Sequence, residues 1–473
     1  MYLSEFLNKN QISEYLNKVN IFHIILVSFS IHMFVINQPV HEVIDEVHFT
    51  NFMRWFMLGI DHSPYQLPGL SVIVSPFVYL FGDNYIAWRL PIILFGMVFL
   101  YFYYKVIEHI TNKKISLLST VILSLSPMIF VHSSLMLRDI PVLALGFFSL
   151  YLYFKNKYYF SAIVIGLSAL IKETAIFFMI FIILWSVIKF NKHNEITIKN
   201  FIPYVLLNHN SRHAIKKSII FVSIILGIFL ISLFVYENTV EVLEYNTKNP
   251  EFFTYDENHD IEKVTMFKIT QTDSTLLEKS INDFNYISKV TDPIHHLNLF
   301  FTKGYYTDIT NTGNEFLSSF LPMKVDVKPI LTEIDSKTDT IISSKENELH
   351  LKQFKIIWIQ SIVNYSYWLI AFWGIIGLIT YAIYDKVKNQ NPISNQTLFL
   401  ILGLTFFIPF LLIDVIRQTY AYYMIHYLPF MALGLILLIH KIVNNKMRTV
   451  VLCSFLTAIC INFIYYFPIK FLG

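Results

Sequence analysis

Residues 84–104 of the sequence read NYIAWRLPIILFGMVFLYFYY, and this stretch decides the class of protein. It is almost continuously apolar and reaches the roughly 20 residues that an α-helix needs to cross a bilayer. Its one charged side chain is that of Arg89, five residues into the run. Because an unpaired charge inside a membrane is costly, Arg89 is expected to have either a buried partner or a functional contact.

The composition of the whole chain agrees with a membrane protein. Of its 473 residues, 55% are hydrophobic, 17% are aromatic and only 15% are charged, whereas soluble domains carry about 25% charged residues. The two cysteines, Cys453 and Cys460, both lie in the last apolar run. They exclude a disulfide scaffold and are expected to be small packing residues.

The apolar run lengths predict an all-α polytopic fold with about eleven membrane-spanning helices. The predicted spans lie near residues 19–38, 84–104, 115–131, 140–154, 158–171, 174–189, 217–236, 357–384, 396–413, 420–440 and 449–470. Residues 70–82 form a shorter apolar run, which predicts an interfacial or re-entrant segment. Residues 1–18 are amphipathic and predict a short interfacial helix rather than a cleavable signal peptide.

The charge distribution predicts how the chain is oriented in the membrane. Residues 237–352 hold 20 acidic and 11 basic residues, whereas the rest of the chain holds 13 acidic and 25 basic residues. With a cytoplasmic N-terminus, lysine and arginine outnumber aspartate and glutamate in the inner connections, whereas the acidic segment 237–353 lies outside. This pattern argues against nucleic-acid binding. It predicts a transmembrane core at 1–236 with a catalytic first outer loop at 39–69, a non-cytoplasmic segment of mixed structure at 237–353, and C-terminal transmembrane helices at 354–473.

The first outer loop carries the most informative polar residues. Asp45 and Glu46 are adjacent carboxylates just after the first span, where an acidic pair needs water, a cation or a substrate. Helical spacing of large apolar residues follows, at Phe49, Phe52, Phe56 and Ile60. This spacing predicts a helix on the bilayer surface. The alternative role of the acidic pair is to cap that helix.

Further motifs follow the acidic pair in a fixed order. They are Asp45-Glu46-Val47-His48-Phe49, His62 with Pro64, Gly82, Ala87-Trp88-Arg89-Leu90-Pro91, Ser126-Pro127, Arg138-Asp139, and Gly166-Leu167 with Lys172. This order resembles the protein O-mannosyltransferases and the related bacterial lipid A aminoarabinose transferases, which share the GT-C membrane fold. The resemblance covers about residues 40–190, and the segment from Arg417 to Pro429 is a weaker match.

Two departures from the family pattern stand out. The His-Pro-Pro element of the family is His62-Ser63-Pro64 here, which affects the local loop geometry. The segment 237–353 shows no repeat of the β-trefoil that eukaryotic members carry, so their acceptor recognition is not transferred to this chain.

The resemblance implies a membrane glycosyltransferase that takes a sugar, mannose by the family pattern, from a polyprenyl- or dolichyl-phosphate donor. The acceptor it favours is a protein Ser or Thr hydroxyl, with inversion at the anomeric carbon. A glycolipid or polysaccharide acceptor is the alternative within the same fold. A secondary transporter is the alternative of another class, although we find no internal repeat of the kind such transporters carry.

The chemistry of this reaction explains which side chains the site needs. A phosphate leaving group departs without a general acid, so the site must supply a base for the acceptor hydroxyl and cations for the phosphate. Asp45 is the predicted base, and Glu46 is predicted to hold the loop. The predicted phosphate-binding cations are Arg89, Arg138, Lys172 and Arg417. Each has a structural alternative. For Arg89 it is an ion pair inside the bundle with Glu46, and for Arg138 it is a local pair with Asp139. For Lys172 and Glu173 it is a tight outer turn, and for Arg417 and Asp414 it is a local arrangement of the same kind.

Other candidates for the site are His48, His62, Asp139 and Tyr423. No cofactor is required by this chemistry, and a divalent cation at the acidic and histidine side chains is kept as an alternative. The expected partners are the polyprenyl-phosphate-linked sugar, an acceptor protein or glycolipid, and the lipid bilayer. The expected location is a prokaryotic plasma membrane, because residues 237–353 contain no Asn-x-Ser/Thr sequon and the chain has no disulfide framework. The orientation predicted from the loop charges places the active site on the non-cytoplasmic side.

Overall fold

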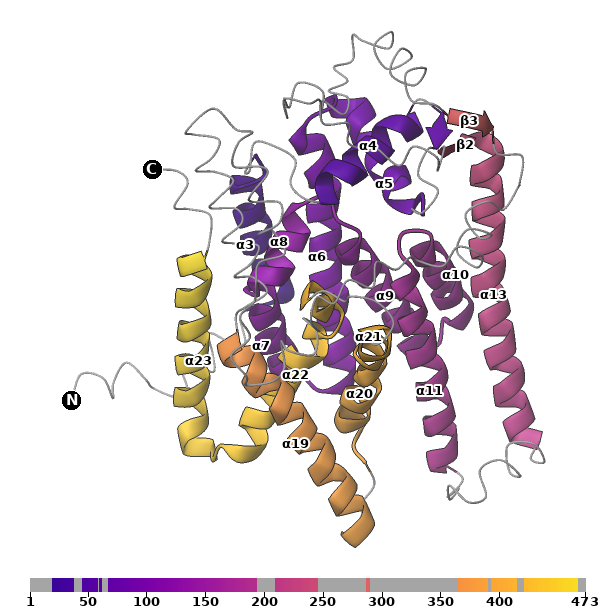
Figure 1. The fold of residues 1–473 in the computed structure, drawn as a ribbon. Helices are drawn as coiled ribbons and strands as arrows, with labels where there is room; N and C mark the ends of the chain where they lie inside the picture. The colour runs from indigo at the N-terminus through magenta and orange to yellow at the C-terminus, as the bar shows by residue number, and fades with distance from the viewer. Residues whose placement is uncertain are drawn as a thin grey trace.

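The computed structural model describes a bundle of α-helices with a small β-sheet at one end (Figure 1). The described residues are 19–37, 45–57, 59–61, 67–193, 209–245, 286–289, 365–389, 393–414 and 421–466. The predicted interfacial helix at 1–18 and most of the segment 237–353 lie outside these residues.

The helices follow the predicted apolar runs closely. The N-terminal part contains α3 (Ile21–Phe34), α4 (Asp45–Met57), α5 (Gly69–Phe81), α6 (Tyr85–Ile110), α7 (Lys113–Ser124), α8 (Pro127–Ser134), α9 (Asp139–Phe154), α10 (Tyr158–Ala169), the 3-10 helix η1 (Glu173–Ala175), α11 (Ile176–His193) and α13 (His209–Thr239). The C-terminal part contains α19 (Tyr365–Asn389), α20 (Asn395–Gly403), η4 (Leu404–Phe406), α21 (Ile408–Asp414), η5 (Ala421–His426), α22 (Leu428–Ile442) and α23 (Asn445–Tyr466). The predicted helical membrane fold is confirmed.

The predicted count of eleven spans is not confirmed. Within the described residues, four helical segments are long and apolar enough to cross a membrane, or five if the bent pair α7 and α8 forms one span. The four are Tyr85–Ile110, Lys216–Thr239, Ile370–Asn389 and Asn395–Leu412. Several further apolar helices, α3 and α9 among them, have only 10–17 residues. Apolar runs in the sequence therefore located the helices better than they predicted which of them cross the bilayer.

Helix α6 lies in the middle of the bundle and carries the arginine of the opening stretch (Figure 1). Asn84 caps its N-terminus, because its side chain accepts hydrogen bonds from the backbone N–H groups of Ile86 and Ala87. Farther along α6, the buried ring of Tyr103 packs against Phe147 of α9, with their centroids 5.4 Å apart. Its hydroxyl donates to the carbonyl of Pro429, at 2.9 Å, and so links α6 to α22.

A sharp bend separates α7 from α8. Pro127 is the first residue of α8, and the two helix axes differ by 67°. Proline has no backbone N–H and tolerates the first helical position, so the chain ends one helix and starts another there. Helix α8 then packs against α6, and residues 135–138 lead from α8 into α9.

The small sheet joins the first outer loop to the end of α13. Strand β2 (Glu241–Tyr245) pairs in parallel with β1 (Ile60–Asp61) and antiparallel with β3 (Tyr286–Lys289), in the order β1-β2-β3. Ile60 pairs with Glu241, and Leu243 pairs with Lys289. The sheet lies at the same end of the bundle as α4 and α5 (Figure 1). The first loop and the start of the 237–353 segment therefore share backbone hydrogen bonds.

A close backbone contact fixes the start of α5. The N–H of Gly69 donates to the carbonyl oxygen of Leu170 at 2.8 Å. A Cβ atom at position 69 would lie 2.7 Å from both the carbonyl carbon and the carbonyl oxygen of Leu170. Only glycine allows this approach, which holds α5 against the turn between α10 and η1.

We expect Gly69→Ala to destabilise the protein by about 1–3 kcal/mol, because the added methyl group overpacks against backbone that cannot rotate away. The measurement is the melting temperature of the detergent-purified protein. Gly227→Ala in α13 is the matched control, since a Cβ at that position meets no atom within 4 Å. An equal melting temperature for Gly69→Ala and the wild type would contradict the predicted clash.

Candidate active site

The acidic pair of the first outer loop lies in the first turn of α4. Asp45 begins the helix and Glu46 follows it. The Glu46 carboxylate is fully buried and accepts two hydrogen bonds from Arg89, from Nε at 2.9 Å and from Nη2 at 2.7 Å. The third contact of Arg89 is from Nη1 to the carbonyl of Ile36, at 3.0 Å. The backbone N–H of Met136 donates to the same carboxylate at 3.1 Å.

This ion pair holds four parts of the chain together. Arg89 comes from α6, Glu46 from α4, Ile36 from the end of α3, and Met136 from the link between α8 and α9. Both charged side chains have a relative exposure of 0%. The bidentate geometry and the two backbone contacts satisfy the charges that burial removes from water. Arg89 therefore has the buried partner that its position in an apolar run requires.

A second buried polar cluster surrounds Asp139, at the first position of α9. Lys172 Nζ lies 2.6 Å from its Oδ1, and His426 Nε2 lies 3.0 Å from the same oxygen. His132 Nδ1 lies 3.7 Å from the other carboxylate oxygen. These groups come from α9, the turn before η1, η5 and the end of α8. The cluster thus joins the N-terminal and C-terminal parts of the bundle.

The partners in this cluster differ from the local alternatives considered from the sequence. The acidic partner of Lys172 is Asp139, which is 33 residues away, rather than the adjacent Glu173. The same contact gives Asp139 a partner other than Arg138. Lys172 also lies over the ring of Tyr423, with its Nζ 5.5 Å from the centroid. Tyr423 is buried and its ring stacks on Phe410, with centroids 5.0 Å apart.

Arg138 differs from Arg89 and Lys172 in its contacts. It precedes α9, and its guanidinium lies over the ring of Phe49 in α4, with Cζ 5.1 Å from the centroid. Its Nε and Nη1 atoms are buried and have no hydrogen-bond partner among the described residues. A buried donor without a partner costs about 1–3 kcal/mol, so a group that accepts its hydrogen bonds would bind favourably there.

The segment between α8 and α9 places these features next to one another. Met136 binds the Glu46 carboxylate, Arg138 covers Phe49, and Asp139 binds Lys172. Within four residues the chain therefore contacts both buried ion pairs and presents a guanidinium beside the helix that starts at Asp45.

The remaining predicted residues are only partly covered by the structure. Asp45 and His48 belong to α4, but the structure does not describe their side chains. His62 and Arg417 lie outside the described residues. Sequence reasoning did not assign a site role to His132 or His426, although both are buried beside Asp139. A signal for His426 was its place in the weak match between Arg417 and Pro429.

No group of three or more His, Cys, Asp or Glu side chains that could hold a metal ion is found among the residues that the structure describes. Asp139 has two histidines near it, but its closest contact is the ammonium group of Lys172 at 2.6 Å. A positive charge at that distance occupies the oxygen that a cation would use. The described part of the Asp139 cluster is therefore organised as an ion pair.

Comparison with known protein families finds a match in the N-terminal half of the chain. Residues 61–207 match the family model described as dolichyl-phosphate-mannose-protein mannosyltransferase. The resemblance seen in the sequence motifs is confirmed there. No curated protein and no solved structure matches the chain significantly.

The segment matched by the mannosyltransferase model contains three of the four predicted cations, Arg89, Arg138 and Lys172. It begins after Asp45 and Glu46, which the structure connects to it through the Arg89 ion pair. Over residues 61–207 the chain is thus similar to a family of mannosyltransferases.

We expect Glu46→Gln to destabilise the protein by about 3–5 kcal/mol, because it leaves the Arg89 guanidinium buried without a countercharge. The melting temperature of the purified protein measures this loss. The double variant Glu46→Gln with Arg89→Met should recover much of the stability, since the unpaired charge is then removed.

Glu108→Gln is the matched control for this prediction, because its ion pair with Lys105 is about one-third exposed and contributes little. If Glu46→Gln melted at the same temperature as Glu108→Gln, the Glu46–Arg89 pair would not hold the fold as described.

Proposed function

We propose that the protein transfers a sugar, mannose first among the candidates, from a polyprenyl-phosphate donor to the hydroxyl of a protein Ser or Thr. The attacking oxygen forms a bond to the anomeric carbon as the bond from that carbon to the phosphate oxygen breaks. The hydroxyl proton passes to the Asp45 carboxylate, and polyprenyl phosphate leaves with the bonding electrons. A single displacement of this kind inverts the anomeric carbon.

The observation that carries this proposal is the pair of buried donor atoms, Nε and Nη1, on the half-buried side chain of Arg138 beside α4. Its Nε and Nη1 donors have no partner among the described residues, and each of these cationic N–H groups can donate to a phosphate oxygen. Phosphate gathers negative charge as it leaves, so a preorganised guanidinium lowers the barrier. We therefore assign Arg138 to the donor phosphate.

The other two described cations take different parts in this proposal. Arg89 has its donors directed at Glu46 and Ile36, so we assign it to holding α4 rather than to the phosphate. Lys172 is held by Asp139 at 2.6 Å, and we assign it to the edge of the phosphate site. Arg417 stays a prediction from the sequence.

The direction in which the site faces is also a proposal. The last turn of α19 carries Lys386 and Lys388, at the end of the bundle opposite α4 (Figure 1). By the positive-inside rule, such lysines mark the cytoplasmic end. The end that carries α4 would then face the non-cytoplasmic side, where polyprenyl-phosphate sugars and unfolded acceptor segments could both reach it.

Asp45→Asn should lower transfer by about 10²–10⁴-fold, because the amide cannot take the proton of the acceptor hydroxyl. The assay uses membranes that contain the variant, a radiolabelled polyprenyl-phosphate mannose and a Ser/Thr-rich acceptor peptide. Asp385→Asn in α19 is the control for loss of a carboxylate far from α4. Wild-type transfer by Asp45→Asn would remove Asp45 as the base, and label found only in lipid extracts would favour a glycolipid acceptor.

Arg138→Gln should lower transfer by about 10²–10³-fold, because the leaving phosphate loses a preorganised cationic donor. Arg138→Lys should retain part of the activity, since it keeps the charge and loses the fixed guanidinium donors. Arg448→Gln is the matched control, because that guanidinium binds the carbonyls of His440 and Val443 between α22 and α23. Equal rates for Arg138→Gln and Arg448→Gln would contradict the assignment.

A further inference from the structure

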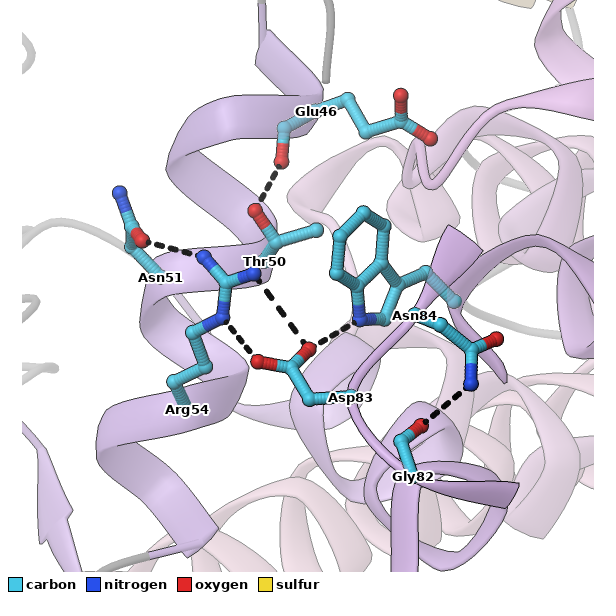
Figure 2. A network of polar contacts seen from close by, with 8 residues as sticks. Glu46, Thr50, Asn51, Arg54, Gly82, Asp83 and Asn84 are labelled. Atoms are coloured by element: carbon cyan, nitrogen blue, oxygen red, sulfur yellow. Dashed lines mark hydrogen bonds and ion pairs between the residues drawn. The ribbon is translucent and has the colours of Figure 1, made fainter. Parts of the chain in front are cut away.

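A third buried polar cluster attaches the other end of α4 to the bundle. Arg54 forms an ion pair with Asp83, from Nε to Oδ2 at 2.7 Å and from Nη2 to Oδ1 at 3.4 Å. The indole N–H of Trp88 donates to Oδ1 of the same carboxylate at 2.7 Å. The guanidinium also lies over the Trp88 ring, with Cζ 5.1 Å from the centroid. Figure 2 shows α4 facing the turn that carries Asp83.

This cluster is built to hold one geometry. The side chains of Arg54 and Asp83 have relative exposures of only 6% and 9%. Nη1 of Arg54 donates to the side-chain oxygen of Asn51, one turn earlier in α4, at 3.1 Å. Ion pairs on protein surfaces contribute little, whereas a buried bidentate pair with further hydrogen bonds resists the loss of either partner. The contacts of Arg54 with Asp83 and Asn51 form a buried bidentate pair with a further hydrogen bond.

The turn before α6 presents Asp83 in a fixed position. Gly82 has φ +81°, a conformation that other residues rarely adopt. Asn84 then donates from its side chain to the carbonyl of Phe81 at 2.8 Å. It also donates to the carbonyl of Gly82 at 3.3 Å (Figure 2). The same side chain caps α6. Local hydrogen bonds on both sides of Asp83 therefore fix its backbone before its carboxylate contacts α4.

The two attachments of α4 lie about two helical turns apart, because Glu46 and Arg54 are eight residues apart in the sequence. Their partners on α6 are adjacent, since Arg89 binds Glu46 and Trp88 belongs to the Asp83 cluster. A helix held at one point can pivot, whereas a helix held at two points cannot. Both ends of α4 are thus attached to side chains at the start of α6.

We infer that Arg54, Asp83 and Trp88 form a positioning clamp. The clamp keeps α4 from pivoting and so keeps Asp45 at a fixed position relative to Arg138. This inference rests on the proposed function, because it gives the clamp its purpose in sugar transfer. The three residues touch no reacting atom in this scheme. They act through α4, and a shift of about 1 Å in a catalytic group can cost about a hundredfold in rate.

The test measures the position of α4 and the rate of transfer in the same full-length protein. Spin labels are placed at Met57→Cys in α4 and Tyr79→Cys in α5, both exposed, with Cys453 and Cys460 replaced by serine. Pulsed electron resonance in lipid nanodiscs gives the distribution of distances between the labels. Transfer is measured with radiolabelled polyprenyl-phosphate mannose and the acceptor peptide, and kcat and KM are determined separately.

Asp83→Asn and Arg54→Gln should each broaden the distance distribution and lower kcat by about tenfold to a hundredfold, because α4 then samples non-productive positions. KM for the donor should change much less. The double variant should be no worse than the more severe single variant, since the two side chains act as one unit. Asp83→Glu, which restores a carboxylate, should recover part of kcat and narrow the distribution. Glu108→Gln, at the far end of α6, should change neither quantity.

Each outcome has a distinct meaning. An unchanged distance distribution in Asp83→Asn would overturn the clamp, whatever the rate. A broadened distribution with wild-type kcat would overturn its role in positioning Asp45. A wild-type protein without transfer would overturn the proposed function, and the distance measurement would still decide whether the cluster holds α4.

Discussion

The buried ion pair between Glu46 and Arg89 is the constraint on which the arrangement of the site depends. A guanidinium in the apolar interior of a bundle requires a carboxylate, and here that carboxylate belongs to the first turn of α4. Helix α4 must therefore lie against α6, and Asp45 must start the helix at that place. The contacts of Ile36 and Met136 with the same pair bring the end of α3 and the start of the α8–α9 link to it.

The cations of the site fall into two groups by their hydrogen bonds. Arg89 and Lys172 each face a buried carboxylate at 2.7 Å or less, so their charges are compensated within the fold. Arg138 has buried donors that no described residue accepts. A site that compensates two cations and leaves buried donors of a third without a described partner is suited to an anionic ligand. This difference, rather than the number of cations, favours a phosphate at Arg138.

Much of the fold could be predicted from the sequence, because lipid imposes a simple rule on helix length and polarity. The runs at 84–104 and 140–154 became α6 and α9 with shifts of a few residues. The run at 115–131 became two helices, since Pro127 breaks it. Run length alone did not separate helices that are long enough to span from shorter ones.

The partners of individual charges were harder to predict. The link between Glu46 and Arg89 was one of the alternatives considered, because a buried arginine needs an acid and few acids were near. The contact between Lys172 and Asp139 joins residues 33 apart and was not anticipated. His426 approaches the same carboxylate from the far end of the chain. Such contacts depend on how helices pack, which hydropathy does not encode.

The most direct test of the central claim is an electron cryo-microscopy structure of the protein in lipid nanodiscs with polyprenyl phosphate bound. The expected result is a phosphate within hydrogen-bond distance of the Arg138 guanidinium, beside the first turn of α4, with the prenyl chain leading into the bilayer. A phosphate bound elsewhere, with Arg138 paired to a protein carboxylate, would contradict the claim.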